Sequence, residues 1–485
     1  MILPAKMLQS FSWKKASAIG LLVAAAAAAA SLYLYFNNVK NGNIALSPSG
    51  VSGAGKDWLT YGGDIWNSFT LSSSSITASD IDQMKQDWFA PADGEVSGNP
   101  VIANSIVYFT TDAGSVYAVS EKSGTLIWKR GLDGSPINSG PLYDSGRIFI
   151  STSGGRIYAL NPKTGGEIWK TGVLFGSLPD ALRASPKAWD GVIYQSLGGT
   201  NDNKYERGGV VAVDEKTGYV LWREDLVQYA GGGSAVFGPP AIIPQLNELV
   251  VSTGNPTPYP TNGDAANRGP VPSGSDYYSD SLVALSLKDG HILWAKQVHS
   301  ADANDYDFIA APNALVLPKG GIAVGAGDKD GSYYLFDAKT GGLLWKKDLS
   351  AFGETTLIMS TAAAGNNAIF AETMDVPTLV SSWPQKYQAP AIGRVIKLEA
   401  GSGRVIWSTN LPAALVAVPA AVNDLIFAIG ANGTLFALNA DSGAIVWQNP
   451  TGGQIWNAEA ALASAGNAIF APLSGKNGVM AFKTR

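Results

Sequence analysis

The chain contains no cysteine and only two histidines in 485 residues, and charged residues make up only 15% of it. Without cysteine there can be no disulfide, thiolate nucleophile or cysteine-ligated metal. Two histidines leave little for zinc, which usually takes imidazole or thiolate ligands. The net charge of −5 is small and evenly spread, so we expect no nucleic acid partner. The chemistry must come from carboxylates, amides, amines or a bound cofactor.

An uncharged segment near the N-terminus predicts export. Residues 16–36 carry no charge and follow Lys14 and Lys15. About 20 apolar residues span a bilayer core, with flanking lysines on the cytoplasmic side. The alternative is a cleaved signal peptide, because the alanine run offers small residues to a peptidase. Either way the remainder is extracytoplasmic, in the periplasm or outside the cell, and it is either secreted or anchored to the membrane by this segment.

The remainder of the chain repeats one phrase seven times. Each copy has an apolar strand, a polar turn with glycine, and a second strand ending in tryptophan, as in VYAVSEKSGTLIW. Glycine supplies the positive φ of a tight hairpin, and tryptophan gives a large apolar plate between neighbouring hairpins. The copies end at Trp128, Trp169, Trp222, Trp294, Trp345, Trp407 and Trp447.

The two ends of the repeat region predict how the array closes. Trp88 has no phrase ahead of it, and the C-terminal strands after Trp447 have no closing tryptophan. Joining them in one blade leaves no long exposed edge. We therefore predict an all-β fold: an eight-bladed β-propeller of four-stranded blades, preceded by one hydrophobic helix. The predicted parts are a signal peptide or signal anchor (1–36), a flexible linker (37–55) and the propeller (56–485).

The longest insertion in the repeat, residues 254–331, predicts the location of the functional site. Insertions in a repeat array form loops on one face, often the binding face. This stretch contains the densest group of Asn, Asp and Lys outside the turns. It includes GNP from Gly254, DANDYD from Asp302, and GDKDG around Lys329.

These motifs, the repeated phrase and the segment WLTYGGDIWNSF resemble the quinoprotein dehydrogenase superfamily. The resemblance runs from Trp58 to the C-terminus and implies an eight-bladed propeller that binds pyrroloquinoline quinone and calcium. It implies that Asn255 is a calcium ligand and Asp302 the catalytic base. Lys329 matches a basic residue that contacts the quinone carbonyls.

Four positions depart from that family. Phe237 stands where the family has an indole under the quinone, and the disulfide over the quinone cannot form. Ser139 replaces an arginine, and Thr200 stands where a calcium-binding glutamate is expected. The quinone's carboxylates need cationic partners, and calcium needs several oxygen ligands. We therefore expect no cofactor. If the quinone and calcium are bound, Asn255, Asp302, Lys329 and Phe237 would contact the quinone, and Asn255 and Asp302 the calcium.

An exported hydrolase is the function we expect instead. The missing cysteine, the modest charge and the reduced quinone site resemble the tetrathionate hydrolases, which cleave tetrathionate to thiosulfate and sulfate. Asp302 would act as acid or base on the attacking water. Lys329 and Arg207 would hold the small anionic substrate. Further substrate contacts are expected from Asn255, Asp305 and Phe237.

Two other functions stay open: a quinone- and calcium-dependent alcohol or sugar dehydrogenase, and a non-catalytic scaffold of the outer-membrane assembly type. A homodimer is also open. For single residues, Lys329 between Asp328 and Asp330 could form a surface ion pair. His299 could act as a proton shuttle. His291 occupies a hairpin turn and should face solvent.

Overall fold

The computed structural model describes most of the repeat region. The described residues are 57–174, 182–198, 208–226, 235–255, 278–299, 306–351, 355–358, 360–365, 367–376, 392–455 and 460–484. The chain separates into two units, residues 1–47 and 48–485, and everything described belongs to the second. The predicted N-terminal helix and linker lie outside the described residues. Within those residues, no helix is long and apolar enough to cross a membrane.

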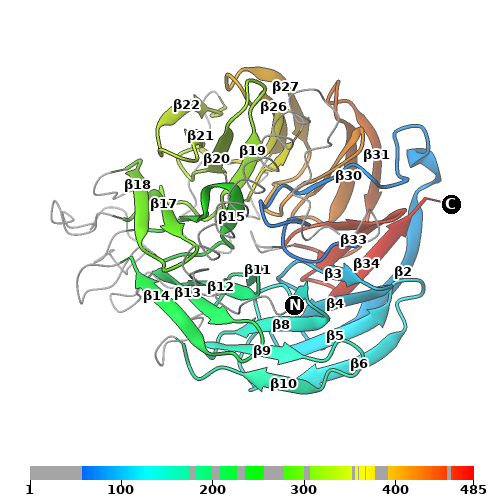
Figure 1. The fold of residues 1–485 in the computed structure, drawn as a ribbon. Coiled ribbons are helices and arrows are strands. Elements are labelled where there is room, and N and C mark those ends of the chain that lie inside the picture. The colour runs from blue at the N-terminus through cyan, green and yellow to red at the C-terminus, as the bar shows by residue number, and fades with distance from the viewer. Residues whose placement is uncertain are drawn as a thin grey trace, which may run out of the picture. The chain divides into compact units, whose positions relative to one another are not determined.

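The described residues form an eight-bladed β-propeller, which confirms the predicted fold (Figure 1). The blades follow one another in chain order around a ring. At seven of the eight junctions between blades the first strands contact each other, so these strands form the inner ring. In the described part of the chain, the helical elements are two short 3-10 turns, η1 (Ile81–Gln83) and η2 (Pro244–Leu246).

Blades 1 to 4 each contain four antiparallel strands in sequence order. Blade 1 consists of β3 (Val101–Ala103), β4 (Ile106–Thr110), β5 (Ser115–Ser120) and β6 (Leu126–Gly131). Blade 2 consists of β7 (Leu142–Asp144), β8 (Arg147–Thr152), β9 (Arg156–Leu160) and β10 (Glu167–Lys170). Blade 3 consists of β11 (Lys187–Trp189), β12 (Val192–Leu197), β13 (Gly209–Asp214) and β14 (Val220–Asp225). Blade 4 consists of β15 (Ala241–Ile243), β16 (Glu248–Ser252), β17 (Ser281–Ser286) and β18 (Ile292–Gln297).

Blades 5 to 7 keep this order, and two of them gain a strand. Blade 5 consists of β19 (Asn313–Val316), β20 (Ile322–Gly327), β21 (Ser332–Asp337) and β22 (Leu343–Asp348). Blade 6 consists of β24 (Ala363–Gly365), β25 (Ala368–Val376), β26 (Ile392–Glu399) and β27 (Val405–Leu411), with β23 (Thr355–Leu357) also paired to β25. Blade 7 consists of β28 (Ala420–Val422), β29 (Leu425–Ile429), β30 (Thr434–Asn439) and β31 (Ile445–Pro450), with β1 (Thr70–Leu71) parallel to β28.

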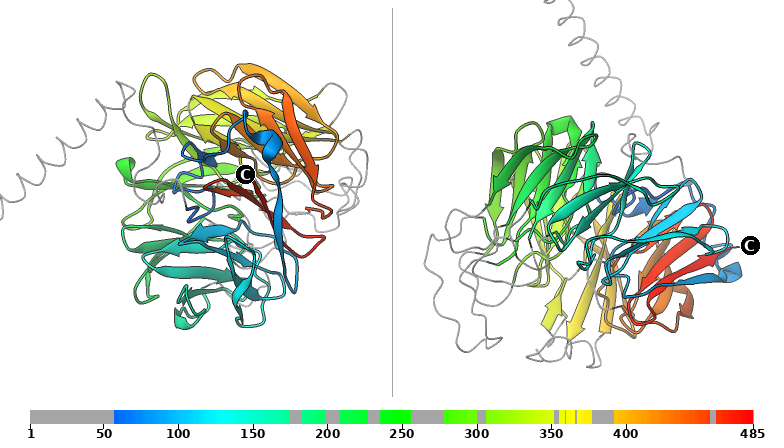
Figure 2. Two further views of the ribbon diagram at one scale, coloured as in Figure 1. Left: turned by 90° about the vertical axis from the view of Figure 1, so that its right-hand side faces the viewer. Right: turned by 90° about the horizontal axis from the view of Figure 1, so that it is seen from below.

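Blade 8 joins the two ends of the propeller, as the sequence predicts. It consists of β32 (Ala463–Ala465), β33 (Ala468–Leu473), β34 (Gly478–Lys483) and, from the other end of the chain, β2 (Lys85–Pro91). The pairing of β2 with β34 is antiparallel and places Trp88 opposite Ala481. Figures 1 and 2 show blue β2 beside red β34. Because β2 pairs with β34, the N-terminal and C-terminal parts of the propeller share one sheet, and the ring closes without an open sheet edge between the first and last blades.

Tryptophan connects neighbouring blades by a repeated contact. At Gly165, with φ of 68°, an added Cβ would lie 2.7 Å from the Trp128 ring of the preceding blade. The Trp128 indole N–H also donates to the carbonyl of Pro162 at 2.9 Å. The same pairing joins Trp88 to Gly124, Trp169 to Gly218, Trp222 to Gly290, Trp294 to Gly341, Trp345 to Gly403 and Trp407 to Gly443. Glycine is required here both for its positive φ and for the close approach of the ring.

The middle strands form the core because both of their faces pack against neighbouring blades. β13 and β17 are buried almost throughout, and their central residues are Val, Leu and Ala. The outermost strands alternate between exposed and half-buried residues, as in β6 and β22. Sheets covered on both faces favour continuous apolar strands over alternating ones.

The segment from Trp58 to Ser75 connects all eight inner strands in order. Its backbone is hydrogen-bonded to blades 1, 2, 4, 5, 6, 7 and 8, for instance from Ile242 N to the carbonyl of Ile65 at 2.7 Å. Blade 3 is reached through Lys187, whose fully buried ammonium donates to the carbonyls of Tyr61 and Asp64. Burial lowers the pKa of Lys187 to about 7 and raises that of Asp64. The motif WLTYGGDIWNSF therefore connects the blades to one another.

Candidate functional site

The propeller topology gathers three of the predicted site residues, Phe237, Asn255 and Lys329, on one face of blades 4 and 5. Strand direction alternates within a blade, so the innermost strand begins on the same face of the propeller on which the second strand ends. The loop before the innermost strand and the loop after the second strand therefore lie on one face. Phe237 precedes β15 and Asp307 precedes β19. Asn255 follows β16 and Lys329 follows β20. Residues far apart in sequence thus meet because of blade geometry.

Gly254 allows an aromatic ring and a carboxylate to approach the backbone of the GNP motif. An added Cβ at Gly254 would lie 2.6 Å from the Phe237 ring and 3.1 Å from Oδ2 of Asp307. The Gly254 N–H donates to the carbonyl of Ala235 at 2.8 Å. Phe237 and Asn255 are both buried, with 8% and 3% of their surface exposed. Phe237 therefore lies as a buried apolar ring against Gly254, the residue before the buried Asn255 amide.

Lys329 pairs with a buried carboxylate of the DANDYD run. Its Nζ lies 2.5 Å from Oδ1 of Asp307, and the two side chains are 14% and 1% exposed. The backbone N–H of Lys329 also donates to the Asp307 carbonyl at 3.4 Å. The alternative of a surface ion pair with a neighbouring aspartate is therefore wrong. Removing one partner of a buried pair leaves an uncompensated charge, so each holds the other in place.

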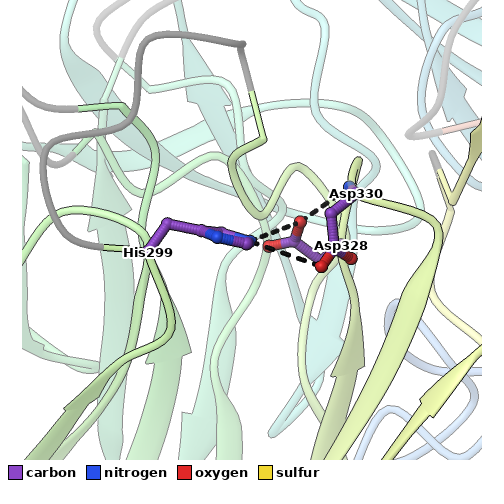
Figure 3. A group of neighbouring side chains, drawn as sticks. All are labelled: His299, Asp328 and Asp330. Carbon is purple, nitrogen blue, oxygen red and sulfur yellow. Dashed lines mark hydrogen bonds and ion pairs between the residues drawn. The ribbon is translucent and has the colours of Figure 1, made fainter.

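A second cluster, His299 with Asp328 and Asp330, lies at the same turn (Figure 3). His299 Nε2 lies 3.3 Å from Oδ1 of Asp328 and 3.5 Å from Oδ2 of Asp330. Burial raises the pKa of Asp328 to about 6. Burial also disfavours the charged form of Asp330, but bonds from Lys346, the Ser332 N–H and Tyr334 outweigh it and lower the pKa. These three residues could hold a metal ion, since one ligand atom of each lies within 4.8 Å of the others.

The structure tests only part of the predicted site. Phe237 and the Asp307 carboxylate both lie against Gly254, Asp307 pairs with Lys329, and Asn255 follows Gly254 in the chain. Asp302, Asp305, Arg207 and Thr200 lie outside the described residues. Their roles, the small anionic substrate and the homodimer therefore stay predictions.

Several other residues have clear positions. Ser139 is buried and its hydroxyl donates to the Ser151 carbonyl at 2.9 Å, so no cation occupies that position. His291 faces solvent as predicted, 2.6 Å from an exposed Asp289 carboxylate. Sequence reasoning missed Asp307 as the partner of Lys329. The only available signal was its place as the last acidic residue of the DANDYD run.

The family and the relatives of this chain agree with the propeller. The matching family model is described as outer membrane protein assembly factor BamB and covers residues 67–198, 112–381 and 329–485. A polyvinylalcohol dehydrogenase of a Pseudomonas species is 21% identical over 450 residues, which are 81% of this chain and 67% of that protein. The dehydrogenase subunit of a quinone alcohol dehydrogenase from Gluconobacter oxydans is 25% identical over 349 residues. That match spans 61% of this chain and 45% of the relative.

Among solved structures, the quinohemoprotein alcohol dehydrogenase from Comamonas testosteroni superposes with a TM-score of 0.75. The match has 17% sequence identity and covers 89% of this chain and 81% of the other, so it shows the fold alone. The expectation of a chain without a cofactor is contradicted by these relatives, because the one from Gluconobacter oxydans is named for a quinone. None of the three is named as a tetrathionate hydrolase, so that prediction gains no support. With matched segments reaching from residue 67 to residue 485, the chain belongs to the PQQ-like repeat family whose model is described as outer membrane protein assembly factor BamB.

Proposed function

We propose that this chain is a quinone-dependent dehydrogenase that oxidises hydroxyl groups of alcohols or of polyvinyl alcohol. The observation that carries the proposal is the meeting of Phe237, Asn255 and the Lys329–Asp307 pair on one face of blades 4 and 5. Relatives named as dehydrogenases align with 81% and 61% of the chain, which supports the same reaction class. We also place this activity outside the cytoplasm, as the N-terminal segment predicts.

The described residues fit a planar quinone. Phe237 offers an apolar ring, and Gly254, which has no side chain, lets that ring pack directly against the backbone before Asn255. The ammonium of Lys329 is the type of donor that a quinone carbonyl accepts. The amide oxygen of Asn255 is a ligand that calcium prefers. When bound, the quinone supplies the electron acceptor for the two electrons released as an alcohol becomes a carbonyl compound.

The protein's own residues position and polarise the reacting groups. Asp307 orients the Lys329 side chain at a buried position, where an ammonium stabilises negative charge on a nearby oxygen more strongly than in water. Phe237 excludes water from one side of the same place. In this proposal Asp302 accepts the hydroxyl proton of the substrate, which is the role that the family resemblance gives it.

The test is reconstitution of the purified chain with pyrroloquinoline quinone and calcium, followed by dye reduction with polyvinyl alcohol and simple secondary alcohols. Activity should require both additions. Lys329→Ala should lower kcat/KM by about 100-fold, the usual effect of removing one electrostatic donor. Lys347→Ala, on the outer strand β22, is the matched control and should have no effect.

Two outcomes would contradict the proposal. One is a chain that shows no quinone absorbance after incubation and no dye reduction with any alcohol. The other is release of thiosulfate from tetrathionate at acidic pH without a cofactor, which would favour the hydrolase. Only the family description supports a non-catalytic scaffold. A scaffold role gives no reason for the buried Lys329–Asp307 pair near the Phe237 ring.

A further inference from the structure

We infer that His299, Asp328 and Asp330 form a binding site for a divalent transition-metal ion such as Zn²⁺, Co²⁺ or Mn²⁺. The site is separate from the quinone and calcium of the proposed function and does not depend on them. His299 comes from the connection after β18 of blade 4, and the two aspartates come from the turn between β20 and β21 of blade 5. The ion would therefore connect two neighbouring blades.

Two of the three spacings between these side chains match the ligands of one ion, and the third, between the two carboxylates, is within 4.8 Å. The Nε2 atom of His299 lies 3.3 Å from Asp328 Oδ1 and 3.5 Å from Asp330 Oδ2. Ligand atoms about 2.0–2.2 Å from one zinc ion at tetrahedral angles are about 3.3–3.6 Å apart. Figure 3 shows the imidazole directed at both carboxylates. Little rearrangement is needed to bring a nitrogen and two oxygens onto one ion.

The buried carboxylate of Asp328 gives independent support for a ligand. This side chain has no exposed surface, and its Oδ2 accepts no hydrogen bond within the described part of the chain. Its Oδ1 already accepts the Asp330 N–H at 2.8 Å. A buried carboxylate oxygen without a partner is costly, and a cation that this carboxylate holds through both of its oxygens would remove that cost.

The ligand types select the kind of ion. Imidazole suits zinc, cobalt and similar ions, whereas calcium and magnesium prefer sites made only of oxygen. Three protein ligands leave positions for water, as in open zinc sites. The two carboxylates would neutralise the charge of a dication.

Lys346 competes with the ion for Asp330. Its Nζ lies 3.0 Å from Asp330 Oδ2, and the Tyr334 hydroxyl donates to the same oxygen at 2.9 Å. Because the Lys346 side chain is 43% exposed, it can turn to solvent when the ion binds. Removing this lysine should therefore strengthen metal binding.

The experiment is titration of the metal-free chain with Co²⁺, followed by visible absorbance and calorimetry. We expect one ion per chain at this site. His299→Gln and Asp328→Asn should each weaken binding by about tenfold or more, the loss typical of disturbed metal ligation. Lys346→Gln should tighten it. His291→Gln is the matched control, because His291 and Asp289 also form a His–Asp pair, but an exposed one outside this cluster.

Unchanged Co²⁺ affinity in both ligand variants, or no binding at millimolar Co²⁺, would overturn the site. If circular dichroism shows that Asp328→Asn does not fold, the test is made with His299→Gln, because His299 is only half-buried. Asn255→Ala separates the two proposals, since it should reduce quinone-dependent activity and leave Co²⁺ binding unchanged. Loss of Co²⁺ binding in that variant would also contradict a separate site.

Discussion

The two faces of the propeller are built differently. On one face, the turn between the third and outermost strands places the same glycine against a tryptophan of the preceding blade in seven described pairs. On the other face, connections of unequal length place Phe237, Asn255, Asp307 and Lys329 together between blades 4 and 5. The first face, here the repeat face, joins neighbouring blades; the second, the site face, carries the candidate site. The candidate site therefore lies where the repeat is interrupted.

Among the described residues, one junction between blades on the repeat face, between blades 7 and 8, lacks the tryptophan–glycine contact. Trp447 of blade 7 packs against the Phe482 ring of blade 8, with ring centroids 5.8 Å apart and nearly perpendicular planes. Blade 8 takes its outermost strand from the N-terminal region, so β34 does not continue into a glycine turn. Closing the ring thus replaced a glycine contact with an aromatic one.

The largest effect should come from breaking the buried pair on the site face. Lys329→Met removes the amine from beside the buried Asp307 carboxylate, so the free energy of unfolding should fall by about 3–5 kcal/mol. Urea unfolding measures this change. The double variant Lys329→Met with Asp307→Leu should recover most of the stability but none of the quinone-dependent activity. Recovery of activity in the double variant would show that the pair serves the fold alone.

A glycine on the repeat face should come next. Gly165→Ala places a Cβ at positive φ and against the Trp128 ring, which should cost about 3 kcal/mol. Gly146→Ala is the control, because Gly146 also has positive φ but nothing within 4 Å of the added Cβ. Its cost should be about 1 kcal/mol. Equal melting temperatures for the two variants would contradict the role of the tryptophan contact.

Glu248 at the start of β16, on the repeat side of blade 4, should give a smaller, pH-dependent effect. Burial, with help from Asp337, raises its pKa from 4.5 to about 8. Below pH 4.5 the Glu248 carboxyl is protonated in both the folded and the unfolded chain. Between pH 4.5 and about pH 8 it loses its proton in the unfolded chain but keeps it in the folded chain. The stability from this group is therefore complete in acid and is lost as pH rises through that window.

Glu248→Gln should remove this loss, which we expect to be about 2 kcal/mol between pH 5 and pH 8. Urea unfolding at the two pH values measures it. Glu167→Gln, at an exposed position of β10, is the control and should behave as the unmodified chain does. An identical pH dependence in the Glu248→Gln variant would show that this carboxyl does not titrate as described.

The smallest effect should come from one hydrogen bond on the repeat face. Trp128→Phe keeps a ring beside Gly165 but removes the indole N–H that donates to Pro162 at 2.9 Å. The cost should be about 1 kcal/mol, the usual net value of a hydrogen bond. Thermal unfolding measures it, and an unchanged midpoint would show that ring packing alone holds the joint.

The fold could be predicted because each repeat carries its own signals. The turn glycine, the apolar strands and the closing tryptophan lie within one short phrase, and the unmatched Trp88 and C-terminal strands reveal the closure. The site was predicted only in part. Asn255, Phe237 and Lys329 could be found through motifs, but Asp307 could not be chosen from a run that holds several aspartates.

The sequence by itself determined the blades, their number, and the shared blade that closes the ring. Local periodicity and turn chemistry are sufficient for that, since each hairpin forms from neighbouring residues. Only the tertiary structure decided which distant groups meet: Lys329 with Asp307, His299 with Asp328, and Lys187 with the segment after Trp58. These partners lie on different blades or connections, so their pairing depends on the packing of the whole ring.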